Sequence, residues 1–292
     1  MSVIVIAGPT ASGKTALGVA LAKKLNGEII SCDSMQIYKE LPICSAQPDE
    51  SEKQNIPHHL MGFVNYFQRF TAYDYRHLAL EKIRDIISRG KQPIIVGGTA
   101  MYFHWLIYNP DFMPEDTDKI RYELEKEETD ALYNRLLKIN PQSNIKANDR
   151  KRIIRALEIF MLTGALPKDT IKEKQKNTEF DFKLFCISPP REILYEKINK
   201  RVDIMLENGM LDEVKYLYDL GINEEHQAFK AIGCRQLIDY FNGVCSLEDA
   251  VEKIKQDSRR YAKRQLTWMR SEDALWLNGT LEENIKAVIQ NI

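Results

Sequence analysis

The first hundred residues alternate between short apolar runs and longer segments of helical periodicity. Residues 3–7 form a β-branched run that ends at a glycine, which is typical of a buried parallel strand. Residues 14–25 then carry apolar side chains on one side of a predicted helix. Further strands are expected at 28–32 and 93–96, with a helix over 73–89 between them. This rhythm of strand and helix predicts an α/β fold with a parallel sheet.

The pattern changes after residue 108. A loop is expected at 109–114, and a charged segment, 115–129, begins a series of predicted helices that runs to residue 162. An apolar strand at 182–188 then returns the chain to the sheet, and helices dominate up to Trp276. We therefore expect a core made of residues 1–110 and 181–292, interrupted by a helical insertion at 111–180.

Composition narrows the class of protein. The 292 residues are 44% hydrophobic, and 41 basic residues nearly cancel 42 acidic ones, so any polyanionic partner requires positive charge gathered locally. The five cysteines are widely spaced and include no CxxC pair, which argues against a disulfide framework and a zinc module. No apolar run is long enough to cross a membrane, and no cleavable leader is evident, so a cytoplasmic protein without membrane contact is expected.

The segment after the first strand matches the phosphate-loop pattern G-x-x-x-x-G-K-[ST] in full. Its glycines let backbone amides turn toward a phosphate, and the following helix adds the positive end of its dipole. The lysine places a charge on the phosphate oxygens, and the final hydroxyl can hold Mg²⁺. The sequence thus predicts a P-loop NTPase-like parallel sheet flanked by helices, with phosphate bound by Gly8, Pro9, Thr10, Ala11, Ser12, Gly13, Lys14 and Thr15.

A second candidate residue, Asp33, follows the strand at 28–32. In open α/β sheets this edge holds the ligands, and P-loop kinases keep an acid here that activates the acceptor. Asp33 is either a general base or the cap of the Asp-Ser turn. The strand at 93–96 ends in Gly97-Gly98-Thr99, without the acid that supports the metal in hydrolysing P-loop proteins. This layout favours group transfer over a motor or switch.

Seven segments, in the same order along the chain, resemble the tRNA dimethylallyltransferases, also called tRNA isopentenyltransferases or the IPP transferase family. No segment after the phosphate loop is decisive alone, but together they cover nearly the whole chain. They are GPTASGKT at 8–15, SCDSMQIY at 31–38, IPHHL at 56–60, VGGT at 96–99, NDRKRIIRALE at 148–158, AIGCRQ at 231–236 and YAKRQLTW at 261–268.

The resemblance implies a reaction. A dimethylallyl group would pass from dimethylallyl diphosphate to the N6 amine of the adenosine adjacent to the anticodon, in tRNAs that read codons beginning with U. Pyrophosphate would leave, and N6-isopentenyladenosine would remain. The expected cofactor is Mg²⁺, the expected partners are the tRNA anticodon stem-loop and dimethylallyl diphosphate, and the expected state is a monomer.

The resemblance also assigns roles to residues of this chain. Asp33 would take the proton from the amine, Thr99 would lie close to the reacting centre, and Arg121 would act from the insertion. Asp33 also belongs to the group expected beside the target nucleotide, with Ser34, Met35 and Gln36. The segments expected to contact tRNA are Lys151, Arg152, Ile153, Ile154 and Arg155, and Lys230, Ala231, Ile232, Gly233, Cys234 and Arg235.

The chain departs from the family pattern in two places. Residues 44–48 read Cys-Ser-Ala-Gln-Pro where Gly-Thr-Ala-Lys-Pro is usual, so a lysine is lost there. Cys234 stands where a tyrosine is common, which removes a ring that could stack on a base. No zinc finger follows Trp276, which resembles the bacterial members.

Two basic clusters are candidates for gripping RNA. An exocyclic amine inside a base stack is inaccessible, so the target adenosine must be unstacked, and an anticodon loop offers such bases. A basic helical face is usually only solvated, but two beside a phosphate loop favour a nucleic-acid partner. The clusters are Arg150, Lys151, Arg152 and Arg155, and Arg259, Arg260, Lys263 and Arg264.

Three other functions remain open from the sequence. A P-loop kinase for a small metabolite would use Asp33 to activate a hydroxyl. An adenylate isopentenyltransferase would modify free AMP or ATP without needing tRNA. A nucleotide switch without catalysis has the least support, because Gly97-Gly98 replaces the metal-binding acid.

Overall fold

The computed structural model describes residues 2–108, 118–164 and 176–292. The loop expected at 109–114 and the first part of the helix expected at 115–129 lie outside these residues. The chain divides into two compact units, one made of Met1–Ile107 with Asn177–Ile292 and the other of Tyr108–Lys176. Each unit is described by itself.

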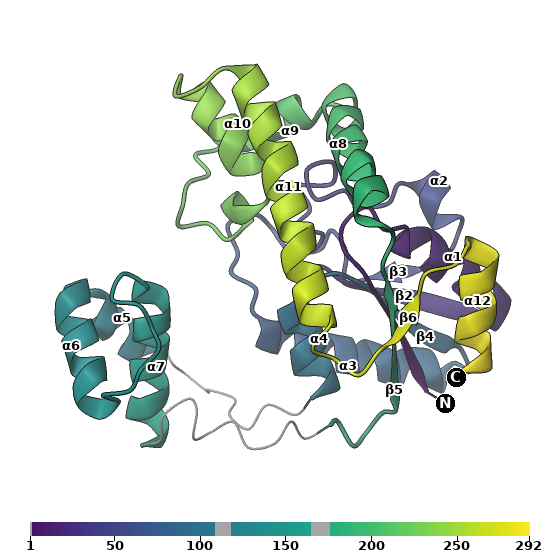
Figure 1. Ribbon diagram of the computed structural model, residues 1–292, viewed down its shortest axis with the longest axis horizontal. Coiled ribbons are helices and arrows are strands. Elements are labelled where there is room, and N and C mark those ends of the chain that lie inside the picture. The colour runs from purple at the N-terminus through teal and green to yellow at the C-terminus, as the bar shows by residue number, and fades with distance from the viewer. Residues whose placement is uncertain (1, 109–117, 165–175) are drawn as a thin grey trace. The chain divides into compact units, whose positions relative to one another are not determined.

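The first unit is built on a six-stranded, all-parallel sheet with the order β3-β2-β4-β1-β5-β6 (Figure 1). Every residue of β1, β2 and β4 is buried, as expected for strands covered on both faces. The predicted P-loop-type parallel sheet is therefore confirmed. The strands are β1 (Val3–Ala7), β2 (Gly27–Cys32), β3 (His58–His59), β4 (Gln92–Gly97), β5 (Phe182–Ile187) and β6 (Leu275–Leu277).

Helices cover both faces of the sheet. On one face, Leu17 and Leu21 of α1 and Ile285 of α12 form a core cluster with Ile4 and Ile94 of the strands. Helix α3 packs against β2, β4 and α4. The helices around the sheet are α1 (Lys14–Leu25), α2 (Glu50–Lys53), α3 (Ala72–Ser88), α4 (Ala100–Ile107) and α12 (Leu281–Gln290).

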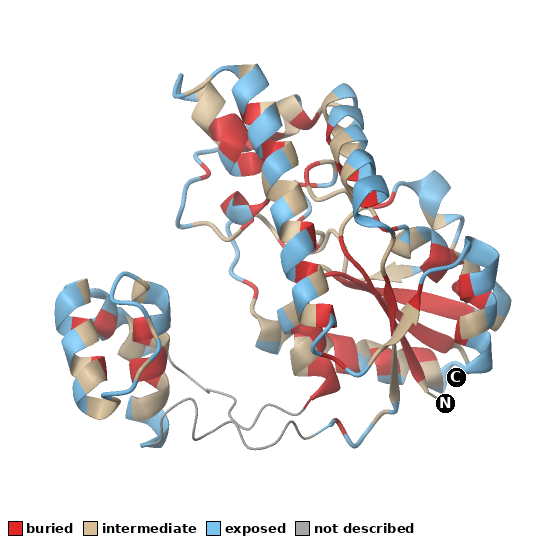
Figure 2. Cartoon of the chain, in the orientation of Figure 1, coloured by how far each residue is buried: buried red, intermediate tan, exposed pale blue. Residues whose placement is uncertain are grey.

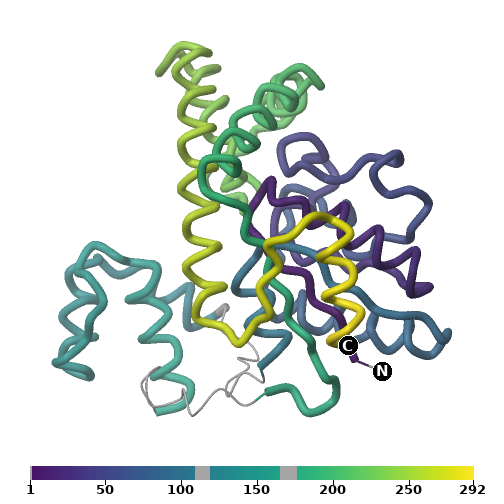
Figure 3. The backbone as a smooth tube through the Cα atoms, turned by 45° about the vertical axis from the view of Figure 1, so that its right-hand side comes forward, coloured from purple at the N-terminus to yellow at the C-terminus, as the bar shows by residue number. Residues whose placement is uncertain are grey.

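A second group of helices follows β5. Helices α8 and α11 run side by side (Figures 1 and 3), and α10 packs against both α9 and α11. None of the helices in the described ranges is long and apolar enough to cross a membrane. The group consists of α8 (Arg191–Glu207), α9 (Met210–Asp219), the 3₁₀ turn η1 (Ala228–Lys230), α10 (Cys234–Phe241) and α11 (Leu247–Met269).

The insertion is a small three-helix unit, α5 (Asp118–Glu125), α6 (Thr129–Ile139) and α7 (Arg150–Thr163). Its core holds Leu132 and Leu136 together with Ile153 and Ile154, whose side chains are buried (Figure 2). Ile153 and Ile154 were expected among the tRNA-contacting residues. Their burial assigns their side chains to packing, because apolar residues at i, i+3 and i+4 spacing form the inner stripe of an amphipathic helix.

Most of the arginines on α7 have partners within the insertion. Buried Glu158 forms ion pairs with Arg121 at 3.0 Å and Arg155 at 2.8 Å. Arg150 donates to the Thr129 hydroxyl at 2.9 Å and to the Glu125 carbonyl at 2.9 Å. A buried carboxylate requires such pairing, because an unpaired charge in the core is costly.

Candidate active site

A cavity of about 320 Å³ lies where the carboxyl ends of the central strands meet α8 and α11. Residues of α8 at positions 198, 201, 202 and 205, and of α11 at 254, 258, 261 and 265, line it at helical spacing, so one face of each helix borders the cavity. It brings together these predicted residues: Thr10, Lys14, Thr15, Asp33, Ser34, Met35, Gln36, Lys230, Ala231 and Ile232.

The phosphate loop is held by a side chain from the far end of the chain. The amide of Gln265 is buried in α11, and its Oε1 accepts from the Thr10 backbone N–H at 2.9 Å. Its Nε2 donates to the Gly98 carbonyl at 2.9 Å. Gln265 therefore joins the loop after β1 to the end of β4, and it fixes the distance between them.

Four cationic residues line the cavity, namely Lys14, Arg201, Lys230 and Arg264, and Arg201 is the one that the sequence did not single out. Burial, followed by the charge of Arg201, lowers the pKa of Lys14 to about 8, and the charge of Asp33 opposes this shift. Burial also lowers the pKa of Arg201. Two poorly solvated cations, one of which lowers the pKa of the other, form a site that an anion stabilises. Arg201 was not predicted from the sequence, because nothing in the charged sequence of α8 distinguishes it from its neighbours.

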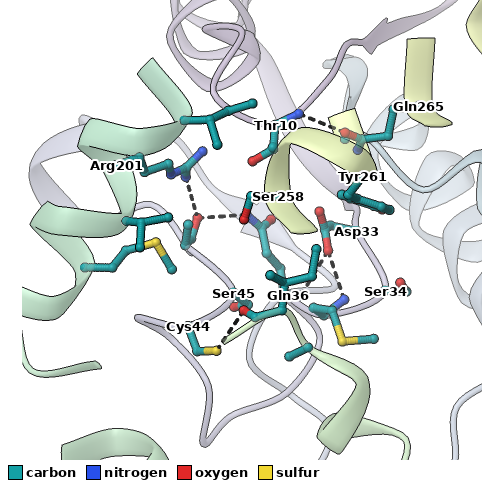
Figure 4. A pocket seen from close by; sticks show the side chains of 18 of the residues that line it. Thr10, Asp33, Ser34, Gln36, Cys44, Ser45, Arg201, Ser258, Tyr261 and Gln265 are labelled. Carbon is teal, nitrogen blue, oxygen red and sulfur yellow. Dashed lines mark hydrogen bonds between the residues drawn. The ribbon is translucent and has the colours of Figure 1, made fainter. Parts of the chain in front are cut away.

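Asp33 lies on the other side of the cavity from Arg201, beside Tyr261 (Figure 4). Its Oδ1 accepts from the backbone N–H groups of Met35 at 2.9 Å and Gln36 at 3.4 Å, so the turn-capping role is observed. This leaves Oδ2 without a hydrogen-bond partner among the described residues. The capping role and a role as base are compatible, because they use different oxygens.

Thr99 lies directly behind this turn. Its Oγ1 accepts from the Ser34 backbone N–H at 2.9 Å and donates to the Ser34 hydroxyl at 3.3 Å. Thr99 is therefore joined to the Asp33 turn, while its own side chain is not part of the cavity lining.

The segment that departs from the family pattern, residues 44–46, forms another wall of the cavity. The carboxylate of Glu213 in α9 accepts from the backbone N–H groups of Ile43 and Cys44, both at 2.7 Å. The Ala46 carbonyl accepts from Gln36 Nε2 at 2.9 Å and from Arg201 at 3.3 Å. Glu213 thus fixes the segment that in turn orients Arg201, a role that no local sequence pattern indicated.

The segment around Cys234, the second place where the chain departs from the family pattern, packs against the segment that begins at Cys44. Cys44 Sγ donates to the Ile232 carbonyl at 3.4 Å, and Cys234 is buried, so its side chain cannot stack on a base. Gly233 has a φ of +112°, and a Cβ there would lie 2.3 Å from Met210 Cε and 2.9 Å from Cys44 Sγ. The backbone at this point requires glycine. The expected contacts of Gly233, Cys234 and Arg235 with tRNA stay predictions, as do those of Arg121 and residues 151–155 in the insertion.

The chain resembles known proteins over nearly its whole length. The model of the IPP transferase family matches residues 36–272. A tRNA dimethylallyltransferase of Acetivibrio thermocellus is 42% identical over 300 residues, covering 100% of this chain and 96% of the relative. One of Bacillus subtilis is 42% identical over 286 residues, covering 95% and 91% of the two chains.

Solved structures give the same result. A tRNA delta(2)-isopentenylpyrophosphate transferase of Staphylococcus epidermidis is 40% identical and superposes with a TM-score of 0.74, covering 99% of this chain and 97% of that one. A eukaryotic dimethylallyltransferase described as acting on tRNA is 34% identical with a TM-score of 0.83, covering 94% and 73%.

Proposed function

The chain belongs to the IPP transferase family and transfers a dimethylallyl group to tRNA, and from this premise we propose its donor, its acceptor atom and its catalytic residues. The donor is dimethylallyl diphosphate. The acceptor is the N6 amine of the adenosine adjacent to the anticodon, in tRNAs that read codons beginning with U. One observation carries the proposal: a single cavity places the Lys14–Arg201 cation pair and the free oxygen of Asp33 on its walls.

The cation end of the cavity suits the diphosphate. The allylic C–O bond breaks only if the departing pyrophosphate is stabilised, so the largest contribution to the rate comes from charge at this end. Lys14, Arg201 and the backbone amides of the phosphate loop supply it. Position 8, at the start of the phosphate loop, requires a small residue, since a Cβ on Gly8 would lie 2.6 Å from Ser12 Oγ.

The residues present also fit Mg²⁺. Thr15 lines the cavity and offers a hard oxygen ligand of the kind that this ion takes, with the remaining positions filled by phosphate oxygens and water. Among the residues that the structure describes, no cluster of three His, Cys, Asp or Glu side chains could form an all-protein metal cage. Thr15 would hold the ion, whose contribution is further neutralisation of the diphosphate charge.

Asp33 serves as the general base. As the N6 nitrogen bonds to the allylic carbon, the pyrophosphate departs with the C–O electron pair, and an N–H proton passes to Asp33 Oδ2. Holding Oδ1 in the turn orients the carboxylate for this transfer. Thr99 supports the turn from behind.

The adenosine reaches the cavity only when it is flipped out of its stack. Ser34, Met35 and Gln36 border the cavity and would contact the flipped nucleotide, together with Lys230, Ala231 and Ile232. Arg121 and the exposed residues Lys151 and Arg152 of the insertion would contact the tRNA backbone. We propose that the enzyme acts in the cytoplasm as a monomer.

The test is transfer of radiolabelled dimethylallyl diphosphate to unmodified tRNA with Mg²⁺, followed by nucleoside analysis. Label in N6-isopentenyladenosine next to the anticodon supports the proposal. Label at another position overturns the proposed acceptor atom. Label on free AMP in preference to tRNA would favour an adenylate isopentenyltransferase, and γ-phosphate transfer from ATP would favour a kinase.

The pH dependence of donor capture should report Lys14. Because its pKa lies at about 8 in the free enzyme, the charged form prevails below that pH and is lost above it. We expect kcat/KM for dimethylallyl diphosphate to fall above about pH 8, roughly tenfold per pH unit once the lysine is mostly neutral. Lys14→Arg stays charged in this range, so its profile should show no such fall. The same fall in both proteins would assign it to another group.

Substituting Glu213 should weaken donor binding and slow the transfer, because both depend on Arg201. Glu213→Gln exchanges one of two acceptor oxygens for a donor that faces a backbone N–H, which loosens the segment holding Arg201. We expect KM for the donor to rise about tenfold and kcat to fall as well, because Arg201 also stabilises the departing pyrophosphate. Asp212→Asn, an exposed neighbour in the same helix, is the control. Equal KM values in the two variants would contradict this role for Glu213.

A further inference from the structure

A second, much smaller cavity lies behind Thr15. Its volume is about 20 Å³, and Thr15, Gln36 and Val96 line both this cavity and the large one. These three residues therefore form the partition between the two spaces. The remaining lining residues of the small cavity are Ile29, Ser31, Pro48, His58 and Met61.

His58 brings an unpaired polar atom to this space. Its Nδ1 lies 2.8 Å from the Ile56 carbonyl oxygen, which can only accept, so Nδ1 carries the proton. In the neutral ring Nε2 is then an acceptor. Nε2 is buried and has no hydrogen-bond partner among the described residues. A buried acceptor without a donor costs about 1–3 kcal/mol, so a partner outside the protein is required here.

The fold points His58 toward the start of α1. His58 pairs with Ile29 and Ser31 pairs with Val96 in the register of the sheet, so all four side chains share one face. That face packs on α1, because Ile29 and Val96 both meet Gly18 of that helix. Thr15 lies in the first turn of the same helix. His58, Ser31 and Thr15 therefore converge on the small cavity from the strand side and the helix side.

We propose that one water molecule fills this cavity and makes His58 a positioning residue for Thr15. The water accepts from the Thr15 hydroxyl and donates to His58 Nε2 and to Ser31 Oγ, whose own proton is directed to Gln36 Oε1 at 3.0 Å. The volume suffices, since a buried water needs about 10–15 Å³ and makes about three hydrogen bonds. Because the proton of the Thr15 hydroxyl is directed to this water, the lone pairs of its oxygen face the large cavity.

This inference rests on the proposed role of Thr15 as a ligand of Mg²⁺. Residues that form hydrogen bonds to metal ligands fix the orientation of those ligands. Losing one such residue typically weakens metal binding by about 10-fold to 100-fold. His58 would thus influence the binding of the metal-bound diphosphate through Thr15, without contacting the diphosphate itself.

The test compares pyrophosphate binding to wild type, His58→Phe and Met61→Leu by calorimetry, with and without Mg²⁺. Phenylalanine keeps the ring and removes the acceptor, and Met61→Leu changes an apolar wall of the same cavity. We expect His58→Phe to bind pyrophosphate about tenfold more weakly with Mg²⁺, and as well as wild type without it. Met61→Leu should match wild type in both. Equal weakening with and without Mg²⁺, or none, overturns the inference.

Nitrogen NMR of the wild-type protein labelled in its histidines gives a second readout that requires no variant to fold. A protonated Nδ1 with a hydrogen-bonded, unprotonated Nε2 is the expected state of His58. A proton on Nε2 at neutral pH would overturn the inference. Failure of the wild type itself to bind pyrophosphate with Mg²⁺ would instead count against the proposed function.

Discussion

Replacing Lys14 with alanine should lower kcat/KM for dimethylallyl diphosphate by about 10³-fold, because the charge that stabilises the departing pyrophosphate is removed from a poorly solvated site. Lys14 is one of four cationic residues that line the cavity, and its ammonium group also donates to the Pro9 carbonyl at 2.8 Å, which fixes the curve of the loop. The measurement is steady-state transfer to tRNA with the donor varied at saturating Mg²⁺.

The matched control for this variant is Lys23→Ala. Lys23 is an exposed lysine in the last turn of the same helix. Replacing it therefore removes one positive charge from α1 and leaves the cavity unchanged. Its kcat/KM should stay within about twofold of wild type, since exposed charges far from a ligand contribute little. A Lys14→Ala enzyme with near-normal kcat/KM would remove the phosphate loop from the mechanism.

Asp33→Asn should lower kcat by about 10²-fold to 10³-fold while leaving donor binding nearly unchanged. Asparagine keeps an acceptor oxygen for the backbone N–H groups of Met35 and Gln36, so the turn survives while the base is lost. The measurement is single-turnover transfer, together with calorimetric binding of pyrophosphate. A kcat close to wild type would show that the amine loses its proton elsewhere.

The relative size of these two effects tests the division of labour in the site. Stabilising the leaving group requires charge throughout bond breaking, whereas the proton leaves an amine that has already begun to bond. Lys14→Ala should therefore reduce turnover at least as much as Asp33→Ala. A larger rate loss for Asp33→Ala with equal binding would make proton removal the more demanding part of the reaction.

The sequence predicts the centre of the sheet well, because its strands are continuous apolar runs between strong breakers. The predicted helix at residues 14–25 matches α1, and the strands expected at 28–32 and 93–96 correspond to β2 and β4 with a residue or so added. The edge strands β3 and β6 escaped prediction. With two and three residues, they are too short for any periodicity, and only pairing with a finished neighbour makes them strands.

The candidate site likewise contains residues that the sequence predicts and residues that it does not. Lys14 and Asp33 belong to local motifs with a mechanism, and the cavity contains both. Arg201, Glu213 and Gln265 act through partners 155 to 255 positions away, and no window of sequence contains such a pair. The segment at 151–155, which is expected to contact tRNA, includes Ile153 and Ile154, whose side chains are buried in the core of the insertion.

The hydrogen bonds of Gln265 have a consequence for the protein as it is being made. The phosphate loop is synthesised within the first fifteen residues, yet the group that holds Thr10 to Gly98 is separated from Thr10 by 255 positions. During synthesis the loop is therefore an incomplete receptor, however well β1 and α1 have formed. A chain interrupted before α11 keeps the whole phosphate-loop motif and lacks the brace that shapes it. The shape of the phosphate loop is thus completed only after α11 has been synthesised.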